Sequence, residues 1–289
     1  MEIAEDGRAA AECVFLAYRP VSPRHIFVLR TFLELLCPPW QREPLQHIIG
    51  SWDFRDLTNV EMARGVFIPR QETEELVDHA FGTLQTVSQS SSWPLLVFDI
   101  GTGTGVIAIS LARLLQVAFP ERPCHVLAID PNPRAVHLAR RNAKTFQVEN
   151  AVSVIRARAR DLTMAEAWKR LPPSMDGAFP QLIVSNPPYV PGNEWTTLDV
   201  EVRKYDPKAA VHGGNDGGTA VIEEILDASL KNHWVRRGAQ LWMEVDPTHP
   251  AWLQERSPWS VTNNERKWSI DRAEEDVHGR LRFVHGILS

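Results

Sequence analysis

The chain has 289 residues and a formal net charge of −5, which permits one large domain, or one domain with a small appendage. The negative balance provides no global basic field for nucleic acid, and no apolar run reaches the roughly 20 residues that span a bilayer. The three cysteines, Cys13, Cys37 and Cys124, lack metal-ligand spacing and indicate reduced thiols in an intracellular protein. We therefore expect no metal site, no membrane partner and no sequence-specific binding of nucleic acid.

The first part of the chain, residues 1–43, is predicted to be a short helical segment. Its clearest element is a helix at His25–Leu36, where apolar residues recur at helical spacing before a pair of prolines. The acidic start of the chain argues against a signal peptide and against an Arg-rich transit peptide.

Residues 44–92 form a second segment of short elements that leads into the main domain. In chain order we expect a short helix ending at Gly50, a hairpin that joins Phe54 to Val66–Ile68, a helix capped by Thr73, and a polar linker at Val87–Ser92.

A regular alternation of apolar strands and helices begins at Leu95 and predicts an α/β fold with a doubly wound, parallel sheet in residues 93–289. A long stretch with little periodicity, Pro191–Gly218, interrupts it. The expected helices are Val106–Leu115, Asn132–Lys144, Met164–Leu171, Ala220–Leu230 and a short one around Trp252. The seven expected strands are Leu95–Ile100, His125–Ile129, Ala151–Ile155, Gln181–Ser185, Gln240–Val245, Trp268–Asp271 and Arg280–Ile287.

A glycine-rich turn, Gly101-Thr102-Gly103-Thr104-Gly105, follows the first of these strands. Its glycines permit positive φ and let a ligand approach the backbone. Asp130, at the end of the second strand, is placed to accept hydrogen bonds from two ribose hydroxyls. The pair indicates a nucleoside cofactor, either a nicotinamide dinucleotide or S-adenosylmethionine. The dinucleotide fingerprint requires a third glycine where this chain has Val106.

Asp161 and Leu162 follow the third strand, where the adenine ring of such a cofactor would lie. Asp161 is a candidate acceptor for the adenine amino group, and Leu162 is a candidate cover for one face of the ring. An ordinary acidic loop is the alternative interpretation of the same two residues.

The fourth strand ends in Asn186-Pro187-Pro188-Tyr189, because neither proline can donate a hydrogen bond to a continuing strand. The Asn186 side-chain oxygen and the Pro187 carbonyl can each accept one N–H of a planar NH2 group, and the Tyr189 ring can lie on its flat face. Two acceptors leave the nitrogen lone pair directed at an electrophile, such as the methyl group of S-adenosylmethionine. The NH2 group would belong to a carboxamide, or to adenine or cytosine. Because acceptance is the proposed role, an aspartate at position 186 should keep more activity than an alanine.

The chain resembles the HemK/PrmC family of protein-glutamine N5-methyltransferases, which modify class I peptide chain release factors. The resemblance begins near Pro44 and continues to the C-terminus, and Glu244–Pro250 is most similar to the animal mitochondrial branch. Where the family usually has proline, this chain has Gln71, and the family carries several helices before the position of Pro44. The matching motifs are Pro44–Gly50, Phe67–Glu74, Asp99–Gly105, Asn186–Tyr189, Tyr205–Pro207 and Gly213–Gly217.

The resemblance implies a seven-stranded class I S-adenosylmethionine-dependent methyltransferase fold and, as substrate, the glutamine of a release factor's Gly-Gly-Gln loop. It implies cofactor contacts at Gly101–Gly105, Asp130, Leu162 and Asn186, and substrate contacts at Asn186, Pro187, Pro188 and Tyr189. Asn186, Pro187 and Tyr189 would serve catalysis. It further leads us to expect a monomer located in the mitochondrion, or otherwise in the cytoplasm. The competing hypotheses are a nucleic-acid adenine-N6 methyltransferase and a non-catalytic binding protein with the same fold.

Overall fold

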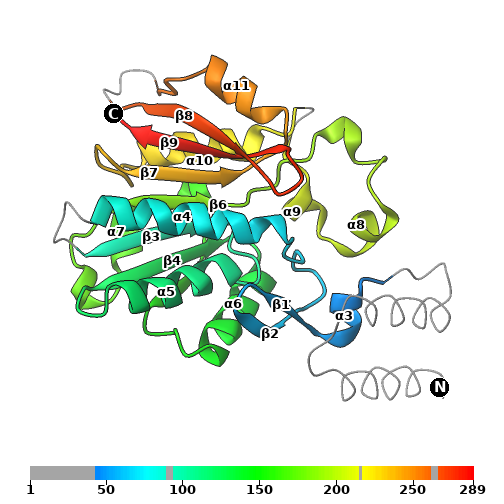
Figure 1. The fold of residues 1–289 in the computed structure, drawn as a ribbon, viewed down its shortest axis with the longest axis horizontal. Coiled ribbons are helices and arrows are strands. Elements are labelled where there is room, and N and C mark those ends of the chain that lie inside the picture. Colours follow the sequence, from blue (N-terminus) through cyan, green and yellow to red (C-terminus); the bar gives the residue numbers. More distant parts are fainter. Residues whose placement is uncertain (1–42, 89–93, 215–216, 262–265) are drawn as a thin grey trace.

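The structure is a computed structural model that describes residues 43–88, 94–214, 217–261 and 266–289 (Figure 1). The helix expected at His25–Leu36 lies outside these ranges. Seven strands form the central sheet: β3 (Leu95–Ile100), β4 (Cys124–Asp130), β5 (Val152–Arg156), β6 (Leu182–Ser185), β7 (Gln240–Glu244), β8 (Trp268–Glu275) and β9 (Leu281–Leu288).

The strands lie in the order β5-β4-β3-β6-β7-β9-β8. The first five are parallel, whereas β9 runs antiparallel to both β7 and β8. The chain builds outwards from β3 in one direction through β4 and β5, and then returns to the other side of β3 with β6. This reversal leaves a crevice outside the carboxyl ends of β3 and β6, which is where ligands bind in open α/β sheets.

Helices cover both faces of the sheet, which accounts for the almost continuous apolar strands (Figure 1). In β3, Leu95 and Val97 pack into one core, while Leu96 and Phe98 pack into the other. The first core is shared with α4 (Glu72–Ser88), α5 (Val106–Ala118) and α6 (Pro133–Thr145), and the second with α7 (Met164–Trp168), α10 (Ala220–Lys231) and α11 (His249–Glu255). The predicted doubly wound α/β fold is therefore confirmed.

The N-terminal hairpin differs from the prediction. The short helix α3 (Leu45–Ile49) does end at Gly50, but β1 (Ser51–Phe54) pairs with β2 (Leu57–Glu61), not with Val66–Ile68. The turn between them has Arg55 at a positive φ of 52°. That turn contains no glycine and no Asn-Gly pair, so it lacks the residues that usually indicate a tight hairpin. Leu57 and Val60 are buried and join the core that α4, α5 and α6 share.

The helix α4 begins one residue before Thr73 and runs to Ser88. Thr73 is therefore inside the helix and does not cap it, and the linker expected at Val87–Ser92 is helical over its first two residues; residues 89–93 lie outside the described ranges. The aperiodic stretch Pro191–Gly218 contains three short helical pieces, η3 (Gly192–Glu194), α8 (Val200–Tyr205) and α9 (Lys208–Val211).

A buried side chain, Asn142 of α6, joins the hairpin to the main sheet region. Its Oδ1 accepts the Glu61 N–H at 3.0 Å, and its Nδ2 donates to the carbonyl oxygens of Glu61 and Thr104 at 3.2 and 2.9 Å. One amide thus holds an edge of β2 and the glycine turn after β3. In the part of the chain that the structure describes, no helix has the length and apolarity to cross a membrane. The division at residues 43 and 92 stays a prediction.

Candidate active site

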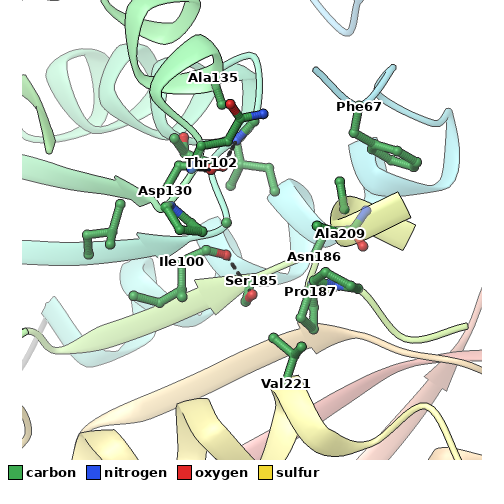
Figure 2. Close-up of a pocket in the computed structure, with 18 of the residues that line it drawn as sticks. Phe67, Ile100, Thr102, Asp130, Ala135, Ser185, Asn186, Pro187, Ala209 and Val221 are labelled. Carbon is green, nitrogen blue, oxygen red and sulfur yellow. Dashed lines mark hydrogen bonds between the residues drawn. The ribbon is translucent and has the colours of Figure 1, made fainter. Parts of the chain in front are cut away.

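A cavity of about 380 Å³ opens at the carboxyl ends of β3, β4, β5 and β6, at the crevice that the strand order creates (Figure 2). Figure 2 shows Thr102 and Asp130 on one side of it, with Asn186, Pro187 and Phe67 on the other. The glycine turn and the Asn-Pro-Pro-Tyr turn, whose first residues Gly101 and Asn186 are 85 positions apart in the chain, therefore line one space. Its volume lies in the range usual for small-molecule sites.

The glycine turn is shaped by backbone constraints that side chains would violate. Gly101, Gly103 and Gly105 all have positive φ, at 77°, 57° and 89°. A Cβ on Gly105 would lie 3.1 Å from the Ala139 Cβ, so this glycine lets α5 and α6 approach. A Cβ on Gly101 would lie 3.7 Å from the Asn186 carbonyl oxygen, and would narrow the passage between the two sides of the cavity.

Asp130 is buried, and both of its carboxylate oxygens face backbone donors. Oδ2 accepts the Gly103 N–H at 3.0 Å, and Oδ1 accepts the Asn132 N–H at 2.8 Å. Burial raises the pKa of Asp130, and these two hydrogen bonds partly offset that rise. Each oxygen keeps a further lone pair, so the carboxylate both shapes the turn and remains able to accept hydroxyl groups from a ligand.

Asp99, the last acid of β3, is completely buried beneath the same turn. Its Oδ2 accepts the Thr102 hydroxyl at 2.6 Å. Burial raises the pKa of Asp99 to about 7, the Thr102 hydrogen bond opposes the rise, and the neighbouring charge of Asp130 adds to it. The floor of the site therefore holds an acid that titrates near neutral pH.

The Asn-Pro-Pro-Tyr turn is held from behind by Glu244, which ends β7 and is 1% exposed. The Asn186 Nδ2 donates to Glu244 Oε2 and to Thr73 Oγ1, both at 2.9 Å. The Thr73 hydroxyl donates to the same Oε2 at 2.7 Å, and the Tyr189 hydroxyl donates to Glu244 Oε1 at 3.0 Å. Burial raises the pKa of Glu244, and the hydrogen bonds from Thr73 and Tyr189 work against that rise.

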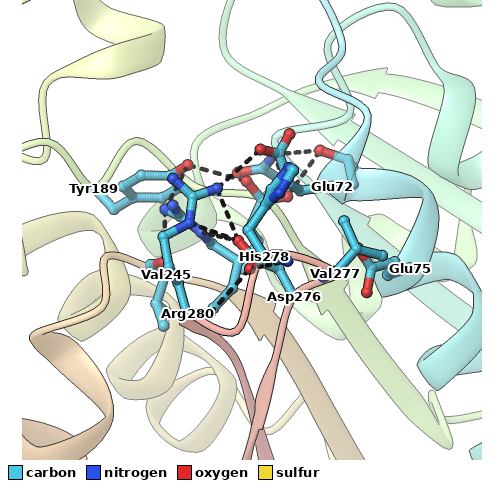
Figure 3. A network of polar contacts seen from close by, with 12 residues as sticks. Glu72, Glu75, Tyr189, Val245, Asp276, Val277, His278 and Arg280 are labelled. Carbon is cyan, nitrogen blue, oxygen red and sulfur yellow. Dashed lines mark hydrogen bonds and ion pairs between the residues drawn. The ribbon is translucent and has the colours of Figure 1, made fainter.

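Behind Tyr189, a second polar network links the start of α4 to the turn between β8 and β9 (Figure 3). Asp276 accepts the backbone N–H groups of His278 and Arg280 at 2.9 and 3.0 Å, and the Arg280 guanidinium also pairs with Glu72 at 3.1 Å. Burial favours a higher pKa for Asp276, but these donors outweigh it and hold the pKa at about 2. The network fixes the end of α4 from which Thr73 reaches the site.

The predicted cofactor and substrate residues do not all reach the cavity. Gly101, Thr102, Gly103, Thr104, Asp130, Asn186, Pro187 and Pro188 line it. Gly105 and Tyr189 stand beside it, and the Tyr189 hydroxyl is turned to Glu244. Asp161 has a side chain that is 67% exposed, and Leu162 is buried in the core beneath α10, so neither lines the cavity. Ala157, Arg158 and Ala159 line it from this segment instead. The adenine contacts of Asp161 and Leu162 stay predictions that this geometry does not support.

Several residues that line the cavity were not predicted from the sequence. Phe67 and Pro69 come from the segment before α4, Ala209 and Ala210 from α9, and Val221 from α10. In a single sequence, apolar residues that line a cavity cannot be distinguished from apolar residues of the core. Glu244 had a stronger signal, because it is an acid at the carboxyl end of the buried strand that adjoins β6.

A family model described as a methyltransferase domain matches residues 97–170. Among solved structures, the ribosomal protein L11 methylase from Lactobacillus delbrueckii subsp. bulgaricus has a TM-score of 0.44 and 15% identity, over 80% of this chain and 84% of that one. That likeness is too distant to bear on a substrate.

Curated relatives are closer. The MTRF1L release factor glutamine methyltransferase of Homo sapiens is 33% identical over 260 residues, which cover 89% of this chain and 71% of the relative. The release factor glutamine methyltransferase of Mycolicibacterium smegmatis is 37% identical over 257 residues, which cover 89% and 79%. The seven-stranded sheet and the methyltransferase match confirm the class I S-adenosylmethionine-dependent methyltransferase fold. At these identities over most of both chains, the protein belongs to the release factor glutamine methyltransferase family.

Proposed function

We propose that this protein transfers a methyl group from S-adenosylmethionine to the side-chain amide nitrogen, N5, of the glutamine in the Gly-Gly-Gln loop of a class I peptide chain release factor. The Thr102–Asp130 side of the cavity would hold the cofactor, and the side lined by Asn186 and Pro187 would take the glutamine amide. The observation that carries the proposal is the placement of Asn186 across one cavity from Asp130, within a chain of this family.

The cavity fits the proposed cofactor in three respects. Asp130 presents a carboxylate with lone pairs left over for ribose hydroxyls. Gly101, at positive φ, leaves the passage towards the Asn186 carbonyl open. Apolar side chains, among them Ile129, Ala135 and Val221, offer surfaces for the adenine ring and the aliphatic carbons.

The chemistry requires placement more than acid or base strength. When bound, S-adenosylmethionine would supply an electrophilic methyl group. The amide nitrogen would take this group and release one proton to solvent, and the electron pair of the carbon–sulfur bond would stay with the neutral thioether product. The Asn186 Oδ1 accepts one N–H of the glutamine amide, and the Pro187 carbonyl accepts the other, so the nitrogen is held in line with the methyl group. Such placement is worth roughly 7–11 kcal/mol of barrier. The two acceptors also stabilise the positive charge that develops on nitrogen.

The test is a methyl-transfer assay on the full chain with labelled S-adenosylmethionine. A class I release factor, the same factor with Gln→Glu in its Gly-Gly-Gln loop, free glutamine, DNA and RNA are offered separately. We expect label only in the unaltered release factor, and peptide mass spectrometry should place it on the loop glutamine. Free glutamine should not react, because it lacks the contacts remote from the loop that order the reacting side chain in a whole release factor.

Label in adenine of DNA or RNA would replace this proposal with a nucleic-acid methyltransferase. No label in any substrate, from a chain that binds S-adenosylmethionine by calorimetry, would indicate a binding protein. Asn186→Ala serves as the matched control of low activity, because it removes the proposed acceptor and leaves Asp130 and the glycine turn in place.

We also propose that the protein works as a monomer in the mitochondrion, without sequence-specific binding of nucleic acid. The cavity is complete within one chain, and the net charge of −5 disfavours a polyanionic partner. The mitochondrial assignment rests on the similarity of Glu244–Pro250 to the animal mitochondrial branch. Light scattering of the purified chain tests the oligomeric state, and fractionation of cells that express it tests the location.

A further inference from the structure

Glu244 lies directly behind the reacting turn but does not line the cavity, so it does not touch the substrate. We propose that Glu244 is a positioning residue that sets which end of the Asn186 amide faces the glutamine. Its carboxylate, together with Thr73, fixes the amide nitrogen inwards and leaves the amide oxygen for the substrate N–H. This inference rests on the proposed function and names the group that makes Asn186 an acceptor.

The direction of every hydrogen bond in the cluster follows from what each group can donate. A carboxylate only accepts, so the atom of Asn186 that lies 2.9 Å from Glu244 Oε2 must be the nitrogen. Thr73 donates its one proton to the same Oε2 at 2.7 Å, so its oxygen is left to accept the second Asn186 N–H at 2.9 Å. Both protons of the Asn186 amide are therefore used inside the protein.

The opposite orientation would be unfavourable on both sides. It would bring the amide oxygen against the Glu244 carboxylate, so that two acceptors face each other in a buried place. It would also direct an N–H of Asn186 at the N–H groups of the glutamine. An asparagine amide is nearly symmetrical in shape, so packing alone cannot choose between the two. The two acceptors behind it, Glu244 Oε2 and Thr73 Oγ1, make that choice.

The second oxygen of Glu244 extends the same control to the far end of the turn. Oε1 accepts the Tyr189 hydroxyl at 3.0 Å, while Oε2 accepts from Asn186. One buried carboxylate thus holds the first and last residues of the Asn-Pro-Pro-Tyr turn. The Arg282 guanidinium, within 3.5 Å of the Tyr189 hydroxyl, supplies a positive charge near it.

The test exchanges the polarity of the pair. Asn186→Asp replaces the inward N–H donors by an oxygen and sets two carboxylates against each other. Glu244→Gln keeps an acceptor for Asn186 when its oxygen faces inwards to Thr73, while its NH2 donates to the Tyr189 oxygen. In the double variant the introduced glutamine can turn and donate to the introduced carboxylate, whose outer oxygen still accepts from the substrate.

We expect Glu244→Gln to retain kcat within about fivefold of wild type, and Asn186→Asp to lose about a hundredfold or more. The double variant should be at least about tenfold faster than Asn186→Asp, which is a coupling that independent sites do not show. KM for the release factor and calorimetric affinity for S-adenosylmethionine should change little in all three. Thr73→Ser should match wild type, and Thr73→Val should lower kcat.

Two results would overturn the inference while leaving the proposed function intact: a double variant no faster than Asn186→Asp, or Asn186→Asp turning over like wild type. If instead the wild-type chain fails to methylate the release factor, the proposed function fails first. Circular dichroism and thermal melts of each variant separate a loss of kcat from a loss of folded protein. Because the decisive comparison is a gain of activity, misfolding cannot imitate it.

Discussion

The cofactor side of the site can be tested through Asp130. Replacing it with alanine removes a carboxylate that is proposed to accept the ribose hydroxyls and that already accepts the N–H groups of Gly103 and Asn132. Hydrogen bonds to a charged group contribute about 1.5–3 kcal/mol. Part of the gain is offset because the same carboxylate is held in a buried place that raises its pKa. We therefore expect Asp130→Ala to weaken S-adenosylmethionine binding by about 1.5–3 kcal/mol, or roughly 10- to 150-fold in Kd.

Isothermal titration calorimetry of the folded variant measures this directly. Asp161→Ala is the matched control, because Asp161 is also an acid after a neighbouring strand but is exposed and does not line the cavity. Its affinity should equal that of wild type. An unchanged Kd in Asp130→Ala, with a native circular dichroism spectrum, would refute the ribose contact. A loss of affinity in Asp161→Ala would restore the adenine contact that the geometry does not support.

Three further changes test the site and its foundation. Asn186→Ala should lower kcat by about a hundredfold, near 2.7 kcal/mol, in a single-turnover assay, with much less effect on cofactor affinity than Asp130→Ala. Asp99 has a pKa raised by burial from 3.8 to about 7, so the folded state retains a proton that the unfolded state releases between these values. Its contribution to stability therefore falls as pH rises through that interval, by up to about 1.4 kcal/mol per pH unit, and urea titrations at pH 5 and 8 should show a smaller difference in Asp99→Asn. Gly105→Ala should lower stability by about 1–3 kcal/mol in the same titrations, because its Cβ would meet Ala139 at 3.1 Å and its φ is positive.

The sheet could be predicted because its strands are apolar along their whole length and the turns between them carry clear signals. β3 was placed to the residue, and β6 and β7 to within one residue at an end. The N-terminal hairpin could not be found in this way. Its turn places Arg55 at positive φ, a conformation that arginine rarely adopts and therefore does not predict. In addition, Val66–Ile68 is as apolar as a strand. Val66 instead packs against Ala135 and Leu138 of α6, so this segment is buried without joining a hairpin.

The candidate site could be predicted where the backbone conformation or the position requires a particular residue type. Glycines at positive φ and an acid at a strand end pointed to Gly101–Gly105 and Asp130, and both line or border the cavity. Asp161 and Leu162 were predicted from their position just after the third strand, and Leu162 also from the family resemblance. The segment that follows β5 is a single 3-10 turn, Ala159–Asp161, which aims Asp161 at solvent and Leu162 into the core. Arg158 and Ala159, three residues before Asp161 and Leu162, therefore line the cavity in their place.

Asn186 shows what a motif alone leaves undetermined. Considered by itself, an acceptor at position 186 is all that the reaction requires, and aspartate should then outperform alanine. In the fold, Glu244 Oε2 and Thr73 Oγ1 each accept one N–H of the Asn186 side chain, at 2.9 Å from its Nδ2. An aspartate would offer them no proton, and the pair of carboxylates would have to share one or separate, with Asp at 186 displaced from its place beside Pro187. The requirement is therefore an acceptor towards the substrate and a donor towards Glu244 in one side chain. The asparagine amide meets it with its oxygen and its NH2 group, whereas an aspartate carboxylate has no donor.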